Sequence, residues 1–192
     1  MLMTQPLSHR PSRTAGTEYV VLVDEDDNAV GVAEKLVAHR DAARHRAVSV
    51  FLFCADGQML LQRRALSKYH SGGLWSNTCC GHPRPGEAPL EAGARRLREE
   101  MGLACPLVPA FGFTYRADLE GGLTEHEYDH VFVGYTEDDP SPDPEEVSEW
   151  ARIDCAALRA DVAARPAQYT AWFQLVFTAV LARTGQLAPP LT

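Results

Sequence analysis

The chain of 192 residues contains few cysteines, and they form no pattern typical of a disulfide-rich protein. Five cysteines are present, an odd number, and no two of them form a CxxC pair. A chain of this length can bury a core without disulfides. The cysteine usage therefore favours a reducing compartment, and we expect a cytoplasmic protein.

Long apolar runs are missing as well. The first 18 residues hold no apolar stretch that would serve as a signal peptide, and no segment reaches the ~20 apolar residues of a membrane helix. Residues 1–17 are rich in Pro, Ser and Thr and are predicted to be a disordered tail. Residues 18–185 are predicted to form a single domain, without an internal repeat.

Excess positive charge is also absent. The net charge is −8, which argues against non-specific binding to nucleic acid. An anionic substrate would therefore need a locally basic pocket. We expect a small-molecule ligand, no nucleic-acid or membrane partner, and a monomer or weak homodimer.

Strand-like segments separated by turn signals fill the first two-thirds of the chain. We predict strands at 18–24, 29–37, 47–54, 58–64, 111–117, 124–135 and 149–153. The dipeptide Asp56-Gly57 predicts a hairpin over 47–64, and residues 39–45 are interpreted as a polar connection. Because hairpins dominate and βα alternation is irregular, we predict an α/β fold of the α+β type, a mixed sheet flanked by helices.

Helical spacing predicts three helices, at 89–101, about 155–163 and 167–183. The first carries an apolar stripe made of Leu90, Ala94, Leu97 and Met101, and Gly102 follows at the usual stopping position. The last is predicted to bury one face, made of Trp172, Leu175, Val176 and Ala179.

Residues 81–102 follow the spacing of a phosphate-handling box, G-x5-E-x7-R-E-x2-E-E-x-G, with one exception. Arg96 stands where the box has a glutamate. Arg96 and Glu100 lie four residues apart, which is also typical of an ion pair on a solvated helix face. Alternatively, Glu87 before the helix and Glu100 near its end hold a hard cation through carboxylate oxygens.

The segment TEHEYDH, residues 124–130, places Glu125 and Glu127 on one face of a strand, where both could reach one ion. An edge strand with a charged exposed side is the alternative interpretation. Three histidines elsewhere would complete a set of five nitrogen and oxygen donors: His39, His45 and His82. Such a set suits Mn, Zn or Fe better than Mg, although single histidines are more often structural.

Two further groups could take part in chemistry. Cys79 and Cys80 are adjacent in an extended segment, so one faces a site and the other the core, unless both are only packed hydrophobes. The basic residues Lys35, Arg63, Arg64 and Lys68 either solubilise the surface or hold a diphosphate.

Together these segments resemble the type 1 isopentenyl-diphosphate delta-isomerases, members of the Nudix superfamily, over about residues 18–180. The resemblance rests on EKLVAH (34–39), RRALSKYHSGGLWSNTCCGHP (63–83), the box at 81–102, FTYRA (113–117) and TEHEYDHVF (124–132). It implies a Nudix fold and the isomerisation of isopentenyl diphosphate to dimethylallyl diphosphate in isoprenoid biosynthesis. In that reaction one proton is added to the alkene and another is removed from C2, through a tertiary carbocation-like state.

The resemblance also implies roles for single residues. Cys80 and Glu127 match the catalytic pair on opposite faces of the substrate, and Tyr115 matches a tyrosine that hydrogen-bonds the glutamate side. The implied Mn²⁺ or Zn²⁺ ligands are His39, His45, His82, Glu125 and Glu127. Glu100 matches the ligand of a Mg²⁺ ion that bridges to the diphosphate. The implied substrate-binding residues are Lys35, Arg64, Lys68, Arg96 and Trp172, of which the tryptophan ring faces the cationic intermediate.

Two other functions are compatible with a box of this kind: a Nudix hydrolase of a nucleoside diphosphate derivative, and a non-catalytic binding module. A hydrolytic box uses several glutamates to hold metals that activate water. Because Arg96 replaces one of them, the box is interpreted as holding a diphosphate and not cleaving it. The full set of metal ligands and the Cys80–Glu127 pair argue against a binding module.

Overall fold

The computed structural model of the chain describes residues 17–185. The predicted tail, residues 1–17, lies outside this range except for Thr17. The strands are β1 (Tyr19–Val23), β2 (Ala29–Glu34), β3 (His45–Phe53), β4 (Met59–Arg64), β5 (Trp75–Ser76), β6 (Cys79–Gly81), β7 (Leu107–Asp118), β8 (Thr124–Tyr135) and β9 (Val147–Ile153). The helices are α1 (Lys35–Arg40), α2 (Pro89–Met101), α3 (Cys155–Ala164) and α4 (Ala171–Thr184), with short 3-10 turns η1 (Glu120–Gly122) and η2 (Pro166–Gln168). None of the helices within residues 17–185 is long and apolar enough to cross a membrane.

The strands form one mixed sheet centred on β3, as predicted. β3 pairs in parallel with β8 and antiparallel with β1, β4 and β6. β7 and β8 form a long antiparallel hairpin in which Tyr115 lies opposite Glu127. On the other side of β8, His45 at the start of β3 also lies opposite Glu127. The register of three neighbouring strands therefore brings these side chains to one end of the sheet.

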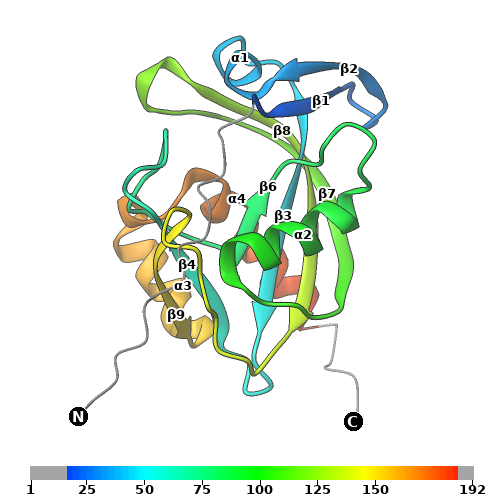
Figure 1. Cartoon of the computed structure of the whole chain (residues 1–192). Helices are drawn as coiled ribbons and strands as arrows, with labels where there is room; N and C mark the ends of the chain where they lie inside the picture. Colours follow the sequence, from blue (N-terminus) through cyan, green and yellow to red (C-terminus); the bar gives the residue numbers. More distant parts are fainter. Residues whose placement is uncertain (1–16, 186–192) are drawn as a thin grey trace, which may run out of the picture.

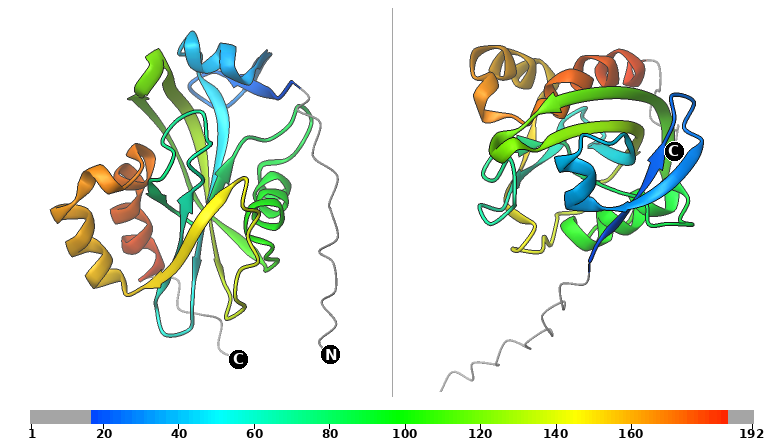
Figure 2. Two further views of the ribbon diagram at one scale, coloured as in Figure 1. Left: turned by 60° about the vertical axis from the view of Figure 1, so that its left-hand side comes forward. Right: turned by 90° about the horizontal axis from the view of Figure 1, so that it is seen from above.

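Helices cover both faces of the sheet, with α2 on one side and α3 and α4 on the other (Figures 1 and 2). Side chains of β3 alternate between these faces. Val50 and Leu52 join a core with Leu97 of α2, whereas Phe51 and Phe53 join a core with α4. Because β3 is buried on both faces, its sequence is almost continuously apolar.

The segment after β2 is a helix, which corrects the prediction of a strand over 29–37. The ladder between β1 and β2 ends where Tyr19 lies opposite Glu34, so the following residues have no strand to pair with. They form α1, which places Lys35 and His39 one turn apart on the same face. The unit of β1, β2 and α1 lies across one end of the sheet (Figure 1).

The predicted bounds of α2 are confirmed, but its predicted buried face is partly wrong. Leu90 is 42% exposed, whereas Ala92 and Gly93 are buried together with Leu97. A Cβ atom on Gly93 would lie 3.4 Å from side-chain carbons of Phe132 and Val50. These small residues let α2 approach the sheet closely. A search for a stripe of large apolar residues does not detect them.

The predicted face of α4 is also partly wrong. Leu175 is 56% exposed and Ala179 is exposed. The buried face consists of Trp172, Phe173, Val176, Phe177 and Val180. Because α4 is apolar around most of its circumference, spacing alone could not select the side that meets the sheet.

Gly102 ends α2 as predicted, in the left-handed conformation with a φ of 67°. A Cβ atom there would lie 2.5 Å from the carbonyl oxygen of Ser141. The loop that follows β8 therefore runs directly against the end of α2, where the Ser141 N–H donates to the Met101 carbonyl oxygen at 2.9 Å. This contact guides the loop toward Glu146, which lines the cavity described next.

Candidate active site

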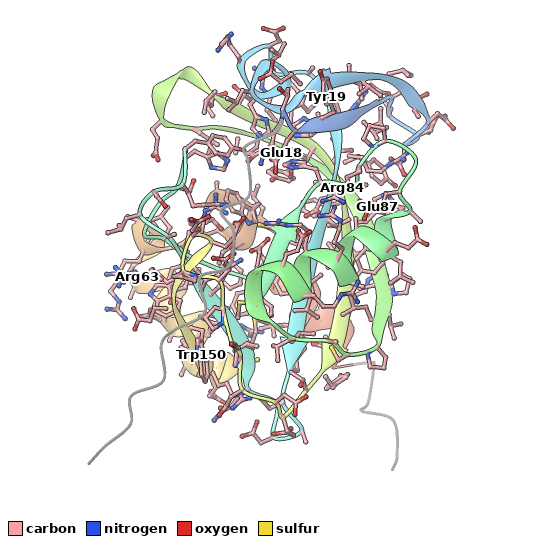
Figure 3. The ribbon with its side chains drawn as sticks, in the orientation of Figure 1. Glu18, Tyr19, Arg63, Arg84, Glu87 and Trp150 are labelled. Carbon is pink, nitrogen blue, oxygen red and sulfur yellow. The ribbon has the colours of Figure 1, made fainter. Side chains whose placement is uncertain are left out.

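A cavity of about 890 Å³ opens beside the unit of β1, β2 and α1. Its walls come from β1, β2, α1, β3, β4, β6, α2, β7, β8 and α4 and from three loops: the loop 65–74 between β4 and β5, the loop before α2 and the loop after β8. Figure 3 labels three residues of its lining: Glu18 just before β1, Tyr19 at the start of β1 and Arg84 on the loop that precedes α2. All residues to which the family resemblance gave a role line this cavity, except His39 and His45. Those two are fully buried in the cluster at its wall.

Three histidines and two glutamates converge at this wall. Each offers one ligand atom, and these atoms all lie within 4.8 Å of one another. They come from α1, the start of β3, the end of β6 and one face of β8: His39, His45, His82, Glu125 and Glu127. The structure thus brings together the five side chains that the resemblance grouped. It also places His45 in β3 and not in a polar connection.

The donor atoms of this His/Glu cluster are oriented as ligands of a cation. His39 Nδ1 lies 2.7 Å from the carbonyl oxygen of Lys35, and His45 Nδ1 lies 2.9 Å from that of Ala43. Each Nδ1–H therefore donates to the backbone and leaves Nε2 free to bind a metal. His45 Nε2 and Glu125 Oε2 are buried without a hydrogen-bond partner, which would be costly unless an ion satisfied them. The residues fit a divalent ion that accepts nitrogen and oxygen donors.

Glu127 stands where the His/Glu cluster meets the cavity. Its Oε1 lies 2.8 Å from His82 Nε2 and 3.4 Å from His45 Nε2. Its Oε2 accepts a hydrogen bond from the Tyr115 hydroxyl at 2.6 Å. Burial alone would raise the pKa of Glu127, but the nearby His45 and the Tyr115 hydroxyl outweigh this effect and lower that pKa. Burial raises the pKa of Tyr115, which therefore keeps its proton and donates it to the hydrogen bond.

The two adjacent cysteines point in opposite directions from β6, which confirms the predicted alternation. Cys79 belongs to the core with Leu60 and Leu97, whereas Cys80 lines the cavity. Burial, with a smaller contribution from the Glu100 carboxylate, raises the pKa of the Cys80 thiol to about 12. Cys80 is thus the cysteine available to a ligand, and it carries its proton at neutral pH.

Basic side chains in the cavity are paired with carboxylates. Lys35 Nζ lies 2.8 Å from Glu18 Oε2. Lys68 and Arg96 share Glu146, whose Oε2 lies 3.3 Å from Arg96 Nη2. Burial would raise the pKa of Glu146, but the charges of Arg96 and Lys68 outweigh it and lower that pKa to about 2. An anionic ligand would compete with Glu18 and Glu146 for these cations.

Arg64 is a further basic residue of the cavity and is 6% exposed. Its Nη2 donates to the His70 carbonyl oxygen at 3.3 Å, and its guanidinium lies 5.2 Å from the ring centroid of Trp172. Arg64 Nε is buried without a partner. Because a buried guanidinium N–H is costly when unpaired, an anion in the cavity would be stabilised here. The Trp172 ring is held in place by a hydrogen bond from Nε1 to Ser76 Oγ at 3.0 Å.

Glu100 is the glutamate of α2 that lines the cavity, and it is 3% exposed. Its Oε1 accepts a hydrogen bond from Arg96 at 2.7 Å and its Oε2 accepts one from Gln62 at 2.8 Å. Glu87 does not line the cavity, and both of its oxygens are bound to Arg95 at 2.7 and 2.8 Å. The structure therefore separates the two carboxylates that the sequence suggested as joint ligands.

Among the charged residues and histidines of the cavity wall that sequence reasoning missed are Glu18, His70 and Glu146. His70 Nε2 lies 3.2 Å from Glu125 Oε1, and burial lowers the pKa of His70 to about 3. Glu18 and Glu146 pair with cations 17 and 78 residues away in the chain. No local sequence pattern identifies such residues, since only the folded chain brings them to their partners.

Comparisons with known proteins agree with this geometry. The sequence model of the NUDIX domain matches residues 43–173. The chain is 52% identical over 165 residues to Isopentenyl-diphosphate Delta-isomerase 1 of Aromatoleum aromaticum, which covers 86% of this chain and 93% of that protein. It is 47% identical over 194 aligned positions to the Isopentenyl-diphosphate Delta-isomerase of Streptomyces griseus, with 97% of both chains covered. The chain belongs to the isopentenyl-diphosphate Delta-isomerase family.

The Nudix fold of this isopentenyl-diphosphate Delta-isomerase family member also has solved relatives. The structure of DR0079 from Deinococcus radiodurans is 25% identical, with a TM-score of 0.64 over 77% of this chain and 90% of that one. The likeness confirms the predicted fold, a mixed sheet flanked by helices.

Membership of the isopentenyl-diphosphate Delta-isomerase family fits the departure of the Nudix box from a hydrolytic pattern. Arg96 Nη1 lies 2.8 Å from Glu99 and Arg96 Nη2 lies 2.7 Å from Glu100. Two carboxylates that a hydrolytic box would offer to metal ions are therefore paired with an arginine. The hydrolase alternative is not favoured, because the curated relatives at about 50% identity are isomerases.

Proposed function

We propose that the chain interconverts isopentenyl diphosphate and dimethylallyl diphosphate by adding and removing protons. One observation carries the proposal: a half-buried thiol, Cys80, shares a cavity with the carboxylate of Glu127, which is hydrogen-bonded to Tyr115. A hydrolase needs a metal-activated water but has no use for such a thiol and carboxylate pair. The similarity to isomerases over most of the chain supports the same function.

Cys80 on β6 and Glu127 on β8 come from two strands that both pair with β3. A substrate between them would meet a thiol on one side and a carboxylate on the other. One group delivers a proton to the terminal alkene carbon, and the other accepts a proton from C2. By microscopic reversibility the two exchange roles in the reverse direction. An alkene is a weak base, so the donor must be held at contact distance, and both groups stand on strands that fix their positions.

The intermediate state resembles a tertiary carbocation and needs negative surroundings without water. Trp172 and Glu127 are both buried and line the cavity. We assign the Trp172 ring to stabilising the cation through its negative face. The exclusion of water from these residues prevents the cation from being trapped as an alcohol.

The diphosphate is assigned to the basic side of the cavity, formed by Lys35, Arg64, Lys68 and Arg96. Glu100 would hold a Mg²⁺ ion, which when bound supplies positive charge beside the diphosphate, because Mg²⁺ in proteins is usually bound by one or two carboxylates plus substrate phosphates. The His/Glu cluster would hold Mn²⁺ or Zn²⁺, which when bound supplies positive charge beside Glu127. The unpaired Nε of Arg64 supports the assignment of the anion to this side.

Proton and phosphorus NMR of the protein with isopentenyl diphosphate and Mg²⁺ tests the proposal. We expect signals of dimethylallyl diphosphate to appear while the diphosphate stays intact. Release of phosphate without isomerisation would point to the hydrolase, and nucleoside diphosphate derivatives would then be the substrates to compare. If neither reaction occurs after Mn²⁺ or Zn²⁺ is added, the enzymatic proposal is wrong and a binding module is left.

A further inference from the structure

His70 stands beside the His/Glu cluster without being one of its five donors. It belongs to the loop 65–74 and is buried. Its Nε2 lies 3.2 Å from Glu125 Oε1, and its Nδ1 lies 3.2 Å from Ser71 Oγ. The imidazole ring meets the Trp172 ring edge-on, with centroids 5.9 Å apart and an interplanar angle of 85°. His70 thus contacts both a candidate metal ligand and the aromatic wall of the cavity.

Glu125 uses its two carboxylate oxygens differently. Oε1 faces His70, whereas Oε2 lies 3.1 Å from His39 Nε2 and has no hydrogen-bond partner. A ligating carboxylate without an outer partner can rotate and present either oxygen, or both, to an ion. A donor on Oε1 would restrict this rotation and leave Oε2 as the ligand atom.

We propose that His70 is a positioning residue for the metal ion, because its Nε2–H donates to Glu125 Oε1 and aims Oε2 into the His/Glu cluster. The inference rests on the metal-binding part of the proposed function and extends it to a residue outside the five donors. A carboxylate oxygen only accepts hydrogen bonds, so the 3.2 Å approach of Nε2 to Glu125 Oε1 favours the tautomer in which Nε2 carries the hydrogen.

Contacts from two distant elements fix the position of His70. The next residue, Ser71, has a left-handed φ of 51°, which is unfavourable for a side chain of this kind. The Ser71 N–H donates to Glu120 Oε1 at 2.8 Å, so the turn between β7 and β8 holds this conformation. Arg64 binds the His70 carbonyl oxygen from the other side, at 3.3 Å. A backbone fixed in this way supports the proposal that the His70 side chain orients Glu125.

Two variants separate the hydrogen bond from the bulk of the ring. His70→Leu fills the space but removes the donor, whereas His70→Gln keeps an N–H near the position of Nε2. Electron paramagnetic resonance of free Mn²⁺ during titration gives the dissociation constant of the purified, chelator-treated protein. We expect His70→Leu to raise the Mn²⁺ dissociation constant about 10–100-fold, the usual effect of losing an outer partner of a metal ligand, and His70→Gln to restore most of the affinity. His130→Leu, a histidine of β8 that pairs with Asp27 outside the cavity, is the matched control and should bind Mn²⁺ normally.

Saturating Mn²⁺ provides a second readout. If His70 acts through the ion, excess Mn²⁺ should return the isomerase kcat of His70→Leu toward that of the unmodified chain, which a loss of packing alone would not allow. Unchanged affinity in His70→Leu, or equal losses in the Leu and Gln variants, would overturn the role of His70 while leaving the proposed function intact. Failure of the unmodified chain to bind Mn²⁺ or Zn²⁺ would instead overturn the metal part of the proposed function. If His70→Leu does not fold, His70→Asn, whose amide is too short to reach Oε1, replaces it in the same comparison.

Discussion

Glu127 has one carboxylate oxygen in the His/Glu cluster and the other on the Tyr115 hydroxyl. A neutral amide at this position would offer one acceptor oxygen where two charged ones stand, so both contacts would change. In the proposed function the same side chain links metal binding to proton transfer. Cys80 is not a candidate metal ligand, so a mutation of Cys80 tests proton transfer without changing the His/Glu cluster.

Cys80→Ala and Glu127→Gln are each expected to lower kcat by at least about 10²–10⁴-fold, the usual contribution of a positioned acid or base. Both variants should keep the far-UV circular dichroism of the folded chain. Steady-state assays of dimethylallyl diphosphate formation measure the effect. Near-normal isomerisation by either variant would show that the pair does not carry the reaction.

Cys79→Ala is the control for the thiol. Cys79 packs in the core with Leu60 and Leu97, so its loss should cost about 1 kcal/mol of stability, similar to a deleted methylene group, while kcat is retained. A thermal unfolding curve and the same assay suffice. Loss of turnover in Cys79→Ala would mean that the wrong cysteine has been assigned.

Arg96→Gln is expected to raise the KM for isopentenyl diphosphate about tenfold or more, since a charged hydrogen bond is worth about 1.5–3 kcal/mol. Glutamine is preferable to glutamate here, because a fourth carboxylate beside Glu99, Glu100 and Glu146 would also disturb folding. Steady-state kinetics at saturating Mg²⁺ provide the measurement. Arg98→Gln, at an exposed position of the same helix, should leave KM unchanged. An unchanged KM in Arg96→Gln would remove this residue from the diphosphate site.

Among the elements, those with strong local periodicity could be predicted from the sequence. The hairpin of β3 and β4, the bounds of α2 and the strand β8 all follow from alternation, helical spacing and turn residues. The shared face of Glu125 and Glu127 follows from the same period of two, and both side chains belong to the His/Glu cluster. Local sequence patterns are sufficient for a prediction where a single strand or helix determines the relative positions of the residues.

Elements that depend on distant partners could not be predicted in this way. The sequence of residues 29–37 alternates like a strand, but β1 is too short to pair with all of it, and the unpaired part forms α1. His70 and Glu146 reach the cavity only because loops are fixed by Glu120 and by the end of α2. Their places depend on tertiary contacts that leave no local pattern in the sequence.

Gly102 sets the contact between α2 and the loop that carries Glu146, so Gly102→Ala should destabilise the fold. Left-handed strain and the clash with the Ser141 oxygen are expected to cost about 1–3 kcal/mol or more, which lowers Tm by about 2–4 °C per kcal/mol in a chain of this size. Gly57→Ala is the matched control, because Gly57 has a φ of 86° but open space where a Cβ would lie. If both variants lower Tm by the same amount, the close approach of the loop to α2 contributes nothing to stability.

At the scale of the whole molecule, an acidic chain concentrates basic side chains in one cavity. The net charge is −8, yet six lysines and arginines line the site, and Glu18 and Glu146 pair with three of them. These pairs lower the cost of gathering like charges in a partly buried space. The folded chain can therefore hold a diphosphate site that is only locally electropositive.

Metal binding should stabilise the whole fold, because the His/Glu cluster joins α1, β3, β6 and β8. A ligand at 100 times its dissociation constant adds about 2.7 kcal/mol, so Mn²⁺ or Zn²⁺ should raise Tm by about 5–10 °C over chelator-treated protein. Differential scanning fluorimetry measures the shift, with Ca²⁺ as a control ion that prefers all-oxygen ligands. The same Tm with and without Mn²⁺ or Zn²⁺ would contradict a structural contribution of the cluster.

The central claim is that this cavity moves a double bond by proton transfer and leaves the diphosphate intact. The most direct measurement is the reaction of isopentenyl diphosphate in D₂O, with the position of deuterium in the product read by proton NMR and mass spectrometry. We expect dimethylallyl diphosphate with deuterium in a methyl group and no release of phosphate. Product that contains no deuterium, or phosphate released in place of isomerisation, would contradict it.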